Sequence, residues 1–402
     1  MAVGMPSEVR TLMIHHRLPL VGVVLLGLNV GAAQSTEYIV SQSIPYSNAE
    51  PGGRGKLAMN ATGDYCLVAR EDCSLVSVFR LEQHGWRESM RLGGDAVSSP
   101  SGLALGKNST ALLLGLVDGK VSAFKLQDDA LKLQAYALAA NASTVTQYRD
   151  VVFHPSGRWF YFVADASNQL WGGALSAKAV PSLTQCFEGG APKGAGRTIG
   201  GVRVVETAGI DYPRCPVVSP DGKDLYVACF KNNSVAHFRI DDDNGVLTFV
   251  RHVKTDEKAK DYVGARDGLT LPCSIGISLD GKLVIVGGAG KGAAVFMRNS
   301  ATGEIGDATS LLVDTTIGNM AAIRLSPNGK YMAVVCRDED YIELFARTAV
   351  GKFAYEATLN NNTVSAPLLS RVSDVCFSAD SSQLIVTSDV ALLASIELLK
   401  TK

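Results

Sequence analysis

The sequence lacks the short motifs that mark several large enzyme classes. It contains no phosphate-binding loop of the GxxxxGK[ST] type, no GxSxG and no HExxH. Those motifs carry nucleotide binding, serine-hydrolase chemistry and zinc-dependent proteolysis. No paired CxxC is present either, and zinc sites are commonly built from such pairs. We therefore expect no metal and no cofactor.

The chain also lacks any concentration of positive charge or any long apolar segment beyond its first residues. Formal net charge is −1, and no block rich in Lys and Arg occurs after residue 33. Nucleic-acid binding normally needs a basic face, so we expect no nucleic-acid partner. No apolar stretch after residue 33 approaches the roughly 20 residues of a membrane span, so we expect no membrane contact beyond the leader.

Residues 1–33 form a segment of different character. Leu18 to Val30 is an apolar run of 13 residues, preceded by Arg10 and Arg17 and followed by the small residues Gly31-Ala32-Ala33. This order is typical of a secretory signal peptide cleaved near Ala33. It predicts a secreted or periplasmic protein, with an uncleaved signal anchor as the alternative.

A motif returns seven times along residues 34–402. Each copy is a short apolar run, a turn resembling Ser-Pro-Asp-Gly, and a second apolar run; the clearest is Val217–Ala228. The other turns centre on Thr62, Asn108, Ser156, Asp280, Asn328 and Asp380, at spacings of 46 to 65 residues. Self-similarity at about this period indicates a β-propeller, and turns with Asp-Gly or Asn-Gly between apolar runs are strong hairpin signals. We predict an all-β, seven-bladed β-propeller with four strands in each blade.

The two ends of the chain are expected to complete one blade together. The last repeat, from Asp374 to Leu399, has only three strand-like runs, and the segment Glu37–Ile44 is a strand without a repeat of its own. Unpaired strand edges invite aggregation, so pairing these ends would close the ring. A phenylalanine recurs in the third strand of several repeats (Phe79, Phe238, Phe296 and Phe345), and we expect these rings to pack between blades.

Eight cysteines are present, an even number that permits four disulfides. Cys215 and Cys229 lie at equal distances from the turn at Gly222, so they could face each other across one hairpin. The alternative is that most cysteines are small buried hydrophobic residues in strands.

Arginines precede the innermost strand of five repeats, and this strand lines the channel of a propeller. Arg149 and Arg214 each stand seven residues before their turn residue. Converging guanidinium groups suit a carboxylate or a phosphate. We therefore predict a substrate site at the channel mouth, formed by Arg54, Arg149, Arg214, Arg266 and Arg371 with Tyr148 and Tyr212. The alternative is that each arginine is neutralised by a neighbouring carboxylate as a structural ion pair between blades.

Histidine is scarce where catalysis is expected. Of six histidines, two lie in the leader and none of the others is predicted at the mouth, which disfavours a histidine-dependent triad or metal cluster there. An acid–base catalyst would have to be a carboxylate, and the candidates are Asp150, Asp211 and Asp374.

The segments Val218–Ala228 and Asn233–Ile240 resemble the seven-bladed lactonase-type propellers. This superfamily includes 6-phosphogluconolactonase-like enzymes, fungal muconate lactonising enzymes and YVTN-repeat surface proteins. The similarity spans most of residues 36–400. At the positions where the enzymes carry their site residues, only Arg214 and Asp165 correspond, and Cys215 stands where they have histidine.

Two functions are therefore carried forward. The resemblance and the arginines imply a lactone hydrolase, a carboxylic ester hydrolase that binds an anionic sugar lactone or acid. The leader and the missing histidines favour a secreted, non-catalytic propeller that binds a glycan, a peptide or an extracellular protein. In either case we expect a monomer.

Overall fold

The structure is a computed structural model that describes residues 38–45, 54–94, 97–115, 119–138, 147–190, 197–207, 209–254, 269–289, 292–312, 320–364 and 366–398. The predicted leader, residues 1–33, lies outside the described residues, as does Arg266. Both therefore remain predictions. Among the described residues every regular element is a strand. No helix that could cross a bilayer is found among them.

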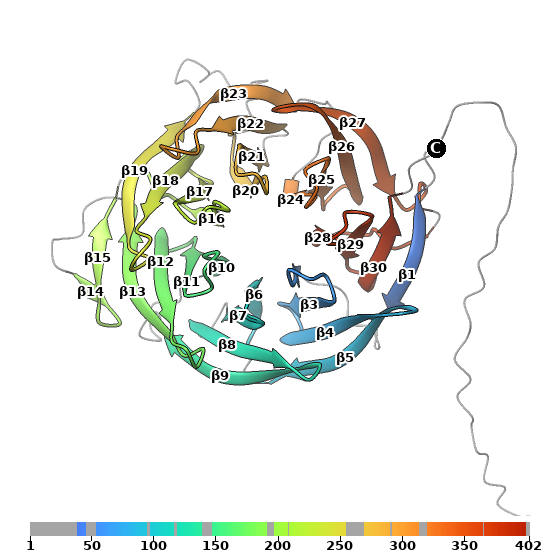
Figure 1. Ribbon diagram of the computed structural model, residues 1–402, viewed down its shortest axis with the longest axis horizontal. Helices are drawn as coiled ribbons and strands as arrows, with labels where there is room; N and C mark the ends of the chain where they lie inside the picture. The colour runs from blue at the N-terminus through green and yellow to red at the C-terminus, as the bar shows by residue number, and fades with distance from the viewer. Residues whose placement is uncertain are drawn as a thin grey trace, which may run out of the picture. The chain divides into compact units, whose positions relative to one another are not determined.

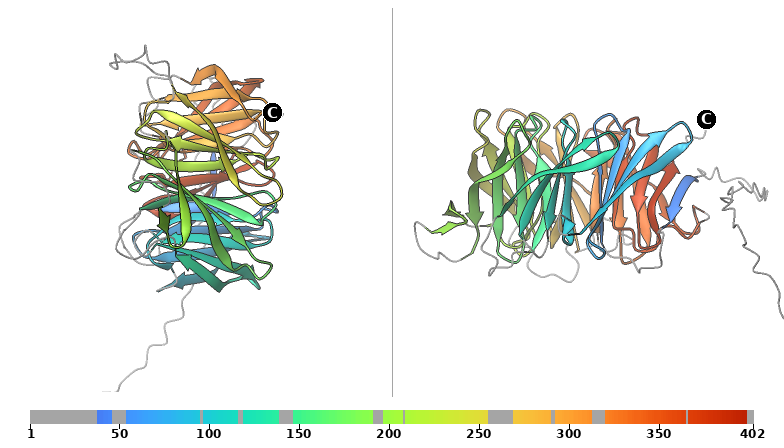
Figure 2. Two further views of the ribbon diagram at one scale, coloured as in Figure 1. Left: turned by 90° about the vertical axis from the view of Figure 1, so that its left-hand side faces the viewer. Right: turned by 90° about the horizontal axis from the view of Figure 1, so that it is seen from below.

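Seven sheets follow one another around a central axis (Figures 1 and 2). The innermost strand of each sheet contacts the innermost strands of both neighbours, so the ring is continuous. We number the sheets as blades I to VII in chain order. The predicted all-β, seven-bladed propeller is confirmed.

Each blade is a meander whose strands run from the axis outward. Blade I contains β2 (Gly55–Met59), β3 (Tyr65–Arg70), β4 (Leu75–Glu82) and β5 (Gly85–Gly93). Blade II contains β6 (Pro100–Leu105), β7 (Thr110–Gly115), β8 (Lys120–Gln127) and β9 (Ala130–Leu138). Blade III contains β10 (Tyr148–Phe153), β11 (Trp159–Ala164), β12 (Gln169–Leu175) and β13 (Pro181–Glu188). Blades IV and V contain β16 (Pro213–Val218), β17 (Asp224–Cys229), β18 (Ser234–Ile240), β19 (Leu247–Lys254); and β20 (Pro272–Ile277), β21 (Leu283–Gly288), β22 (Gly292–Arg298), β23 (Ile305–Leu312). Blades VI and VII contain β24 (Met320–Leu325), β25 (Tyr331–Cys336), β26 (Tyr341–Ala349), β27 (Lys352–Asn360); and β28 (Asp374–Phe377), β29 (Gln383–Thr387), β30 (Ala391–Glu397), β1 (Ile39–Pro45).

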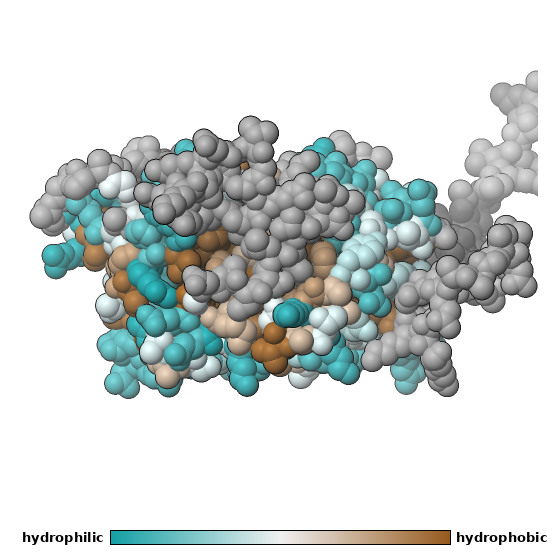
Figure 3. All heavy atoms as spheres, turned by 90° about the horizontal axis from the view of Figure 1, so that it is seen from above, coloured by the Kyte–Doolittle hydropathy of each residue, from teal (hydrophilic) through white to brown (hydrophobic). Residues whose placement is uncertain are grey.

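Blade III is wider than the others. A short hairpin, β14 (Thr198–Ile199) and β15 (Val202–Glu206), extends it, with β15 pairing parallel to β13. Figure 3 shows the ring from above the orientation of Figure 1, and on the coloured part of that face hydrophilic and hydrophobic side chains are interspersed.

The N-terminal strand closes the ring, as predicted. β1 pairs antiparallel with β30, in a register from Ile39 opposite Glu397 to Pro45 opposite Ala391. The side chain of Gln42 then reaches into blade I. Its Oε1 accepts a hydrogen bond from the Trp86 amide, and its Nε2 donates to the Trp86 carbonyl, both at 2.5 Å. This strand therefore completes blade VII and holds the outer turn of the first blade.

The repeated turn sequence is explained by its hydrogen bonds. In the copy in blade IV, Ser219 Oγ accepts a bond from the Asp224 amide at 3.0 Å, and Asp221 Oδ1 accepts one from the Lys223 amide at 3.2 Å. Gly222 has φ of 78°, in the left-handed region where a side chain is strained. Equivalent serine bonds recur at Ser278 and Ser326. Each part of the motif thus has a local structural task.

The second strand of each blade is buried on both faces because it lies between neighbouring sheets. In β7, β11, β17 and β21 all six residues are buried, which explains their continuous apolar sequences. The recurring phenylalanines of the third strand pack onto the preceding blade. Phe238 lies with its ring centre 5.2 Å from that of Phe187 in blade III, and Phe296 shares one buried cluster with Tyr226 of blade IV. The predicted packing of these rings between blades is confirmed.

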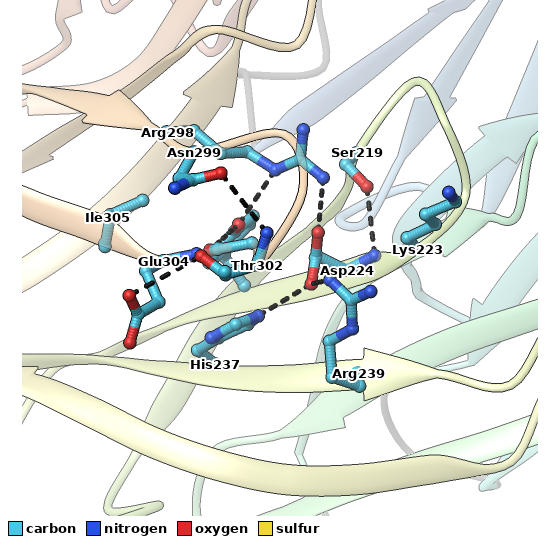
Figure 4. A network of polar contacts seen from close by, with 12 residues as sticks. Ser219, Lys223, Asp224, His237, Arg239, Arg298, Asn299, Thr302, Glu304 and Ile305 are labelled. Atoms are coloured by element: carbon cyan, nitrogen blue, oxygen red, sulfur yellow. Dashed lines mark hydrogen bonds and ion pairs between the residues drawn. The ribbon is translucent and has the colours of Figure 1, made fainter.

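Buried polar contacts join blades IV and V at the end opposite the starts of the inner strands (Figure 4). Asp224 has a fully buried side chain. Its Oδ1 lies 2.8 Å from His237 Nε2 and accepts a bond of 2.8 Å from Arg239, while its Oδ2 accepts one from Arg298. Arg298 also donates to the hydroxyl of Tyr226 at 3.0 Å. Burial raises the pKa of the Asp224 carboxyl, but the bonds from His237 and Arg298 outweigh it and hold the pKa below its usual value.

The cysteines form no disulfide; all eight are described and all eight are free thiols. The predicted pairing of Cys215 with Cys229 is wrong, because a bulge shifts the register of the hairpin. Cys229 lies opposite Pro213, and Cys215 lies opposite Ala228. Burial raises the pKa of Cys215 and of Cys229 to about 12. The alternative, small buried hydrophobic residues, describes these two side chains.

Candidate functional site

A cavity of about 270 Å³ lies where the innermost strands begin. We call it the mouth cavity. Every blade contributes at least one lining residue at or near the start of its innermost strand: Lys56, Ser101, Arg149, Arg214, Cys273, Ala321 and Ser373 from blade I to blade VII, with Arg54, Gly55, Pro100 and Met320 beside them. Loops between the second and third strands add further lining residues, including Glu71, Phe230, Arg337 and Asp338.

β-bulges direct these side chains to the cavity. In blades II to VI the pairing of the innermost strand skips one residue, and the skipped residue in each case lines the cavity: Ser101, Arg149, Arg214, Cys273 and Ala321. A bulge leaves its extra residue unpaired and can re-aim its side chain, and bulges are common beside active sites. Five neighbouring blades therefore share one device for placing a side chain at the mouth.

Blade I differs because β2 pairs with β3 without a bulge. Two residues of β2 line the cavity: Gly55 stands seven residues before the turn residue, as in the bulged blades, and Lys56 stands six before it. The seven-residue spacing of Arg149 and Arg214 was visible in the sequence. Applied to blades II, V, VI and VII, the same spacing gives the lining residues Ser101, Cys273, Ala321 and Ser373. Lys56 is the functional candidate that sequence reasoning missed.

Arg214 lines the cavity between two aromatic rings. Its guanidinium lies 4.1 Å from the ring centre of Phe230 and 5.2 Å from that of Tyr212. Its Nε is buried and has no hydrogen-bond partner, and no ion pair joins it to a described residue. Burial lowers the pKa of Arg214, and neighbouring Arg149 lowers it further. A guanidinium held in this way favours an incoming anion.

Arg149 is already neutralised. Its Nε donates to Asp165, whose side chain is fully buried, and its Nη2 donates to Gln147 Oε1 at 3.3 Å. Arg149 thus lines the cavity beside Arg214 with a fixed counter-charge behind it. Both positions at which the sequence corresponds to the lactonase-type enzymes, Arg214 and Asp165, belong to this wall.

Lys56 faces the cavity from blade I with its side chain 29% exposed. Its Nζ lies 3.1 Å from Asp150 Oδ2, across to blade III. Burial lowers the pKa of Lys56, but the carboxylates of Asp150 and Asp374 outweigh this effect, so the pKa is raised. The Lys56 ammonium is therefore a permanent charge at neutral pH.

Two of the three predicted catalytic carboxylates are engaged in contacts between blades. Asp150 is paired with Lys56. Asp374 is buried, lies 2.7 Å from Arg324 Nη2 in blade VI, and accepts a bond of 3.2 Å from the Leu57 amide in blade I. For these two residues the geometry matches the alternative of structural ion pairs. Asp211 is held through its backbone, because its carbonyl accepts a hydrogen bond from the Lys231 amide at 3.3 Å.

The remaining predicted residues are spread around the mouth. Arg54 lines the cavity. Arg371 is 55% exposed and lies 3.3 Å from Asp389, which Arg337 also approaches at 3.5 Å. Tyr148 is fully buried, with its ring centre 5.1 Å from that of Phe162, whereas Tyr212 supports Arg214. The roles assigned to these residues from the sequence stay predictions.

Two acidic residues line the cavity from its loops. Glu71 and Asp338 lie in loops of blades I and VI, and neither has a salt bridge with a described residue. No cluster of His, Cys, Asp and Glu among the described residues has the arrangement of a metal site. The cavity thus joins a basic wall in blades III and IV to a loop region with unpaired carboxylates.

Comparison with known proteins gives one family match and many similar folds. The family model "Lactonase, 7-bladed beta-propeller" matches residues 106–317, more than half of the chain. No curated protein sequence matches.

Solved structures with this fold include a candidate 6-phosphogluconolactonase from Bacteroides uniformis, with TM-score 0.60, 18% identity, and coverage of 76% of this chain and 84% of that one. A protein from Lactobacillus plantarum gives TM-score 0.61, 18% identity, and coverage of 77% and 85%. The β-propeller domain of Myceliophteria thermophila Cps50 (Swd1) gives TM-score 0.62 and 13% identity, and the match covers 88% of this chain and 99% of that one. At these identities the likeness concerns the fold alone.

Proposed function

Because this chain belongs to the family of seven-bladed lactonase-type β-propellers, we propose that its mouth cavity binds an anionic sugar lactone and hydrolyses it to the acid. The observation that carries the proposal is Arg214. It is a guanidinium fixed against two aromatic rings in a cavity, with a buried Nε that no described residue satisfies. A carboxylate or phosphate on the ligand would supply the missing partner. The candidate 6-phosphogluconolactonase among the structural neighbours suggests a phosphorylated sugar lactone as the first compound to test.

The charges around the cavity suggest how the ligand would be oriented. Its anionic group would lie at Arg214 and Arg149, on blades IV and III, and its lactone carbonyl would extend toward blade I. There the Lys56 ammonium could stabilise negative charge that develops on the carbonyl oxygen, and preorganised cations of this kind lower the barrier to acyl transfer.

Water would be the nucleophile, and an unpaired carboxylate would be its base. Glu71 fits this role better than Asp150 or Asp374, because Glu71 lines the cavity without an ion pair to any described residue. Glu71 takes a proton as the water oxygen forms a bond to the carbonyl carbon. The ring C–O bond then breaks, and the proton passes to the leaving alkoxide, which becomes the hydroxyl group of the acid.

The test is proton release in a pH-stat, corrected for spontaneous hydrolysis, with 6-phosphogluconolactone and uncharged gluconolactone as substrates. For Arg214→Ala we expect KM for the charged lactone to rise by a factor of about 10 to 100, the worth of a hydrogen bond between charged groups. KM for the uncharged lactone should change little. Arg203→Ala removes an exposed arginine from β15 and serves as the control. Glu71→Gln should lower kcat for both lactones.

The non-catalytic alternative is favoured by one observation, the engagement of Asp150 and Asp374 in ion pairs between blades. If the wild-type protein releases no more acid than the blank, hydrolysis of this class is rejected. Calorimetry with 6-phosphogluconate then shows whether the mouth cavity binds an anionic sugar acid without hydrolysing its lactone. Binding that is lost in Arg214→Ala supports the binding role, and absence of binding rejects the assignment of the mouth cavity.

A further inference from the structure

The opposite end of the ring carries a second concentration of positive charge. A groove of about 830 Å³ lies between the turns of blades II and III, on the end away from the mouth cavity. Four cations line it, and no carboxylate does: Lys107, Lys125, Arg158 and Lys178. We call it the basic groove. In a chain with a formal net charge of −1, four cations without a lining acid are a marked local excess.

None of the four cations has an ion-pair partner among the described residues, and two are held in place by other contacts. The Nζ of Lys125 donates to the backbone carbonyl of Asn108. The guanidinium of Arg158 lies 4.3 Å from the ring centre of Trp159, as a cation–π pair. Lys107 and Lys178 are exposed on either side. Four cations spread along a groove suit a ligand with several anionic groups rather than one.

The other lining groups indicate the kind of polyanion. Ser109, Thr110 and Ser176 supply hydroxyl groups, and Asn108 and Gln134 supply amides, all at the groove. Such groups bind the hydroxyls of sugars. Nucleic-acid sites without sequence preference add aromatic faces on which bases stack. Here none of the described residues that line the groove is aromatic, and Trp159, which Arg158 covers, is buried.

We propose that the basic groove binds an acidic oligosaccharide, one that carries sulfate or uronate groups along its chain. This site is separate from the mouth cavity, and its assignment does not depend on lactone hydrolysis. Binding would rest mainly on exposed charges, so it should weaken steeply as salt increases.

The experiment is calorimetry with a heparin hexasaccharide at 50 and 200 mM NaCl. The test variant combines Lys107→Gln, Lys125→Gln and Lys178→Gln. The matched control combines Lys223→Gln, Lys282→Gln and Lys330→Gln, which removes three exposed lysines from the equivalent turns of blades IV, V and VI. We expect the test variant to bind about tenfold more weakly, from three exposed charge contacts, and the control to stay within about twofold.

Three further arms make the result decisive. Uncharged dextran of similar length should not bind, and a single-stranded oligonucleotide of equal charge should bind more weakly than the hexasaccharide. Lys178→Gln alone, in an exposed turn, gives a smaller loss and replaces the triple variant if that does not fold. No binding by the wild type, equal losses in both triple variants, or tighter binding of the oligonucleotide would each overturn the proposal.

Discussion

Replacing Asp224 by asparagine should destabilise the propeller at the contact between blades IV and V. The side chain is fully buried, and its two oxygens accept bonds from His237, Arg239 and Arg298. Asparagine keeps the shape, but it removes the charge and presents an NH₂ group toward cationic neighbours. Breaking one partner of a buried ion pair costs about 3–5 kcal/mol. Arg298 keeps a bond of 2.9 Å to Asp221, so we expect the lower end, about 3 kcal/mol.

The loss is measurable by urea unfolding and by thermal melting. Given the unfolding entropy expected of a domain of this size, ~3 kcal/mol lowers Tm by roughly 4 °C. The pH dependence has a definite sign. The pKa of Asp224 is lower in the folded protein, so its contribution is present above the unfolded pKa and is lost as pH falls below about 4. The difference between wild type and variant should therefore be constant near neutral pH and shrink in acid.

Asp221 provides the matched control. It pairs with the same guanidinium, but its side chain is 33% exposed, so Asp221→Asn should cost less than about 1 kcal/mol. If the two variants lose equal stability, or if Asp224→Asn loses under 1 kcal/mol, burial does not determine how much this network contributes to the free energy of unfolding, and the prediction is refuted.

Three other outcomes are expected. Gln42→Leu should cost about 1–2 kcal/mol in urea unfolding, because two hydrogen bonds to Trp86 disappear; an unchanged midpoint would mean that the N-terminal strand is not held by them. The pKa of Lys56 is raised, so its stabilising charge is complete below about pH 10 and is lost only as pH rises further. Lys56→Met should therefore change stability by the same amount at pH 6 and pH 9, and a pH-dependent difference would contradict the ion pair. Dithiothreitol should leave Tm unchanged, since the cysteines are free thiols, and a drop in Tm would indicate a disulfide.

The fold could be predicted because each blade repeats the same local chemistry. The serine, the acidic residue and the glycine of the turn make bonds within five residues, so they leave a sequence signature that does not depend on the rest of the chain. The closing strand could be inferred by counting, since one blade lacked a fourth strand. The pairing of Cys215 with Cys229 failed for a reason that sequence does not display. A single bulged residue changes which side chains face each other across a hairpin.

The site was predictable only in part, for the same reason. The seven-residue spacing of Arg149 and Arg214 reflects the bulge that places both at the mouth, whereas Arg54 and Arg371 precede other strands at other spacings. Lys56 escaped notice because the seven-residue spacing points to Gly55 in blade I, which has no side chain, and Lys56 stands one residue later. The roles of Asp150 and Asp374 depend on partners in other blades, Lys56 and Arg324, and no local pattern reveals such pairs.

The seven lining positions also bear on whether this propeller is an enzyme. Charged residues occupy them only in blades I, III and IV, while blades II, V, VI and VII contribute Ser101, Cys273, Ala321 and Ser373. A ligand held by Arg214 is therefore oriented, with its anionic end on one wall. Turnover then requires a carboxylate that is not neutralised at the other end of the ligand, and Glu71 meets that condition where Asp150 and Asp374 do not. Comparing the rates of Glu71→Gln and Asp338→Asn in the pH-stat tests whether Glu71 is the catalytic base. If Glu71→Gln alone loses kcat while binding 6-phosphogluconate normally, the carboxylate is catalytic; if neither variant changes a measurable rate, Glu71 is not the base and the catalytic role proposed here fails.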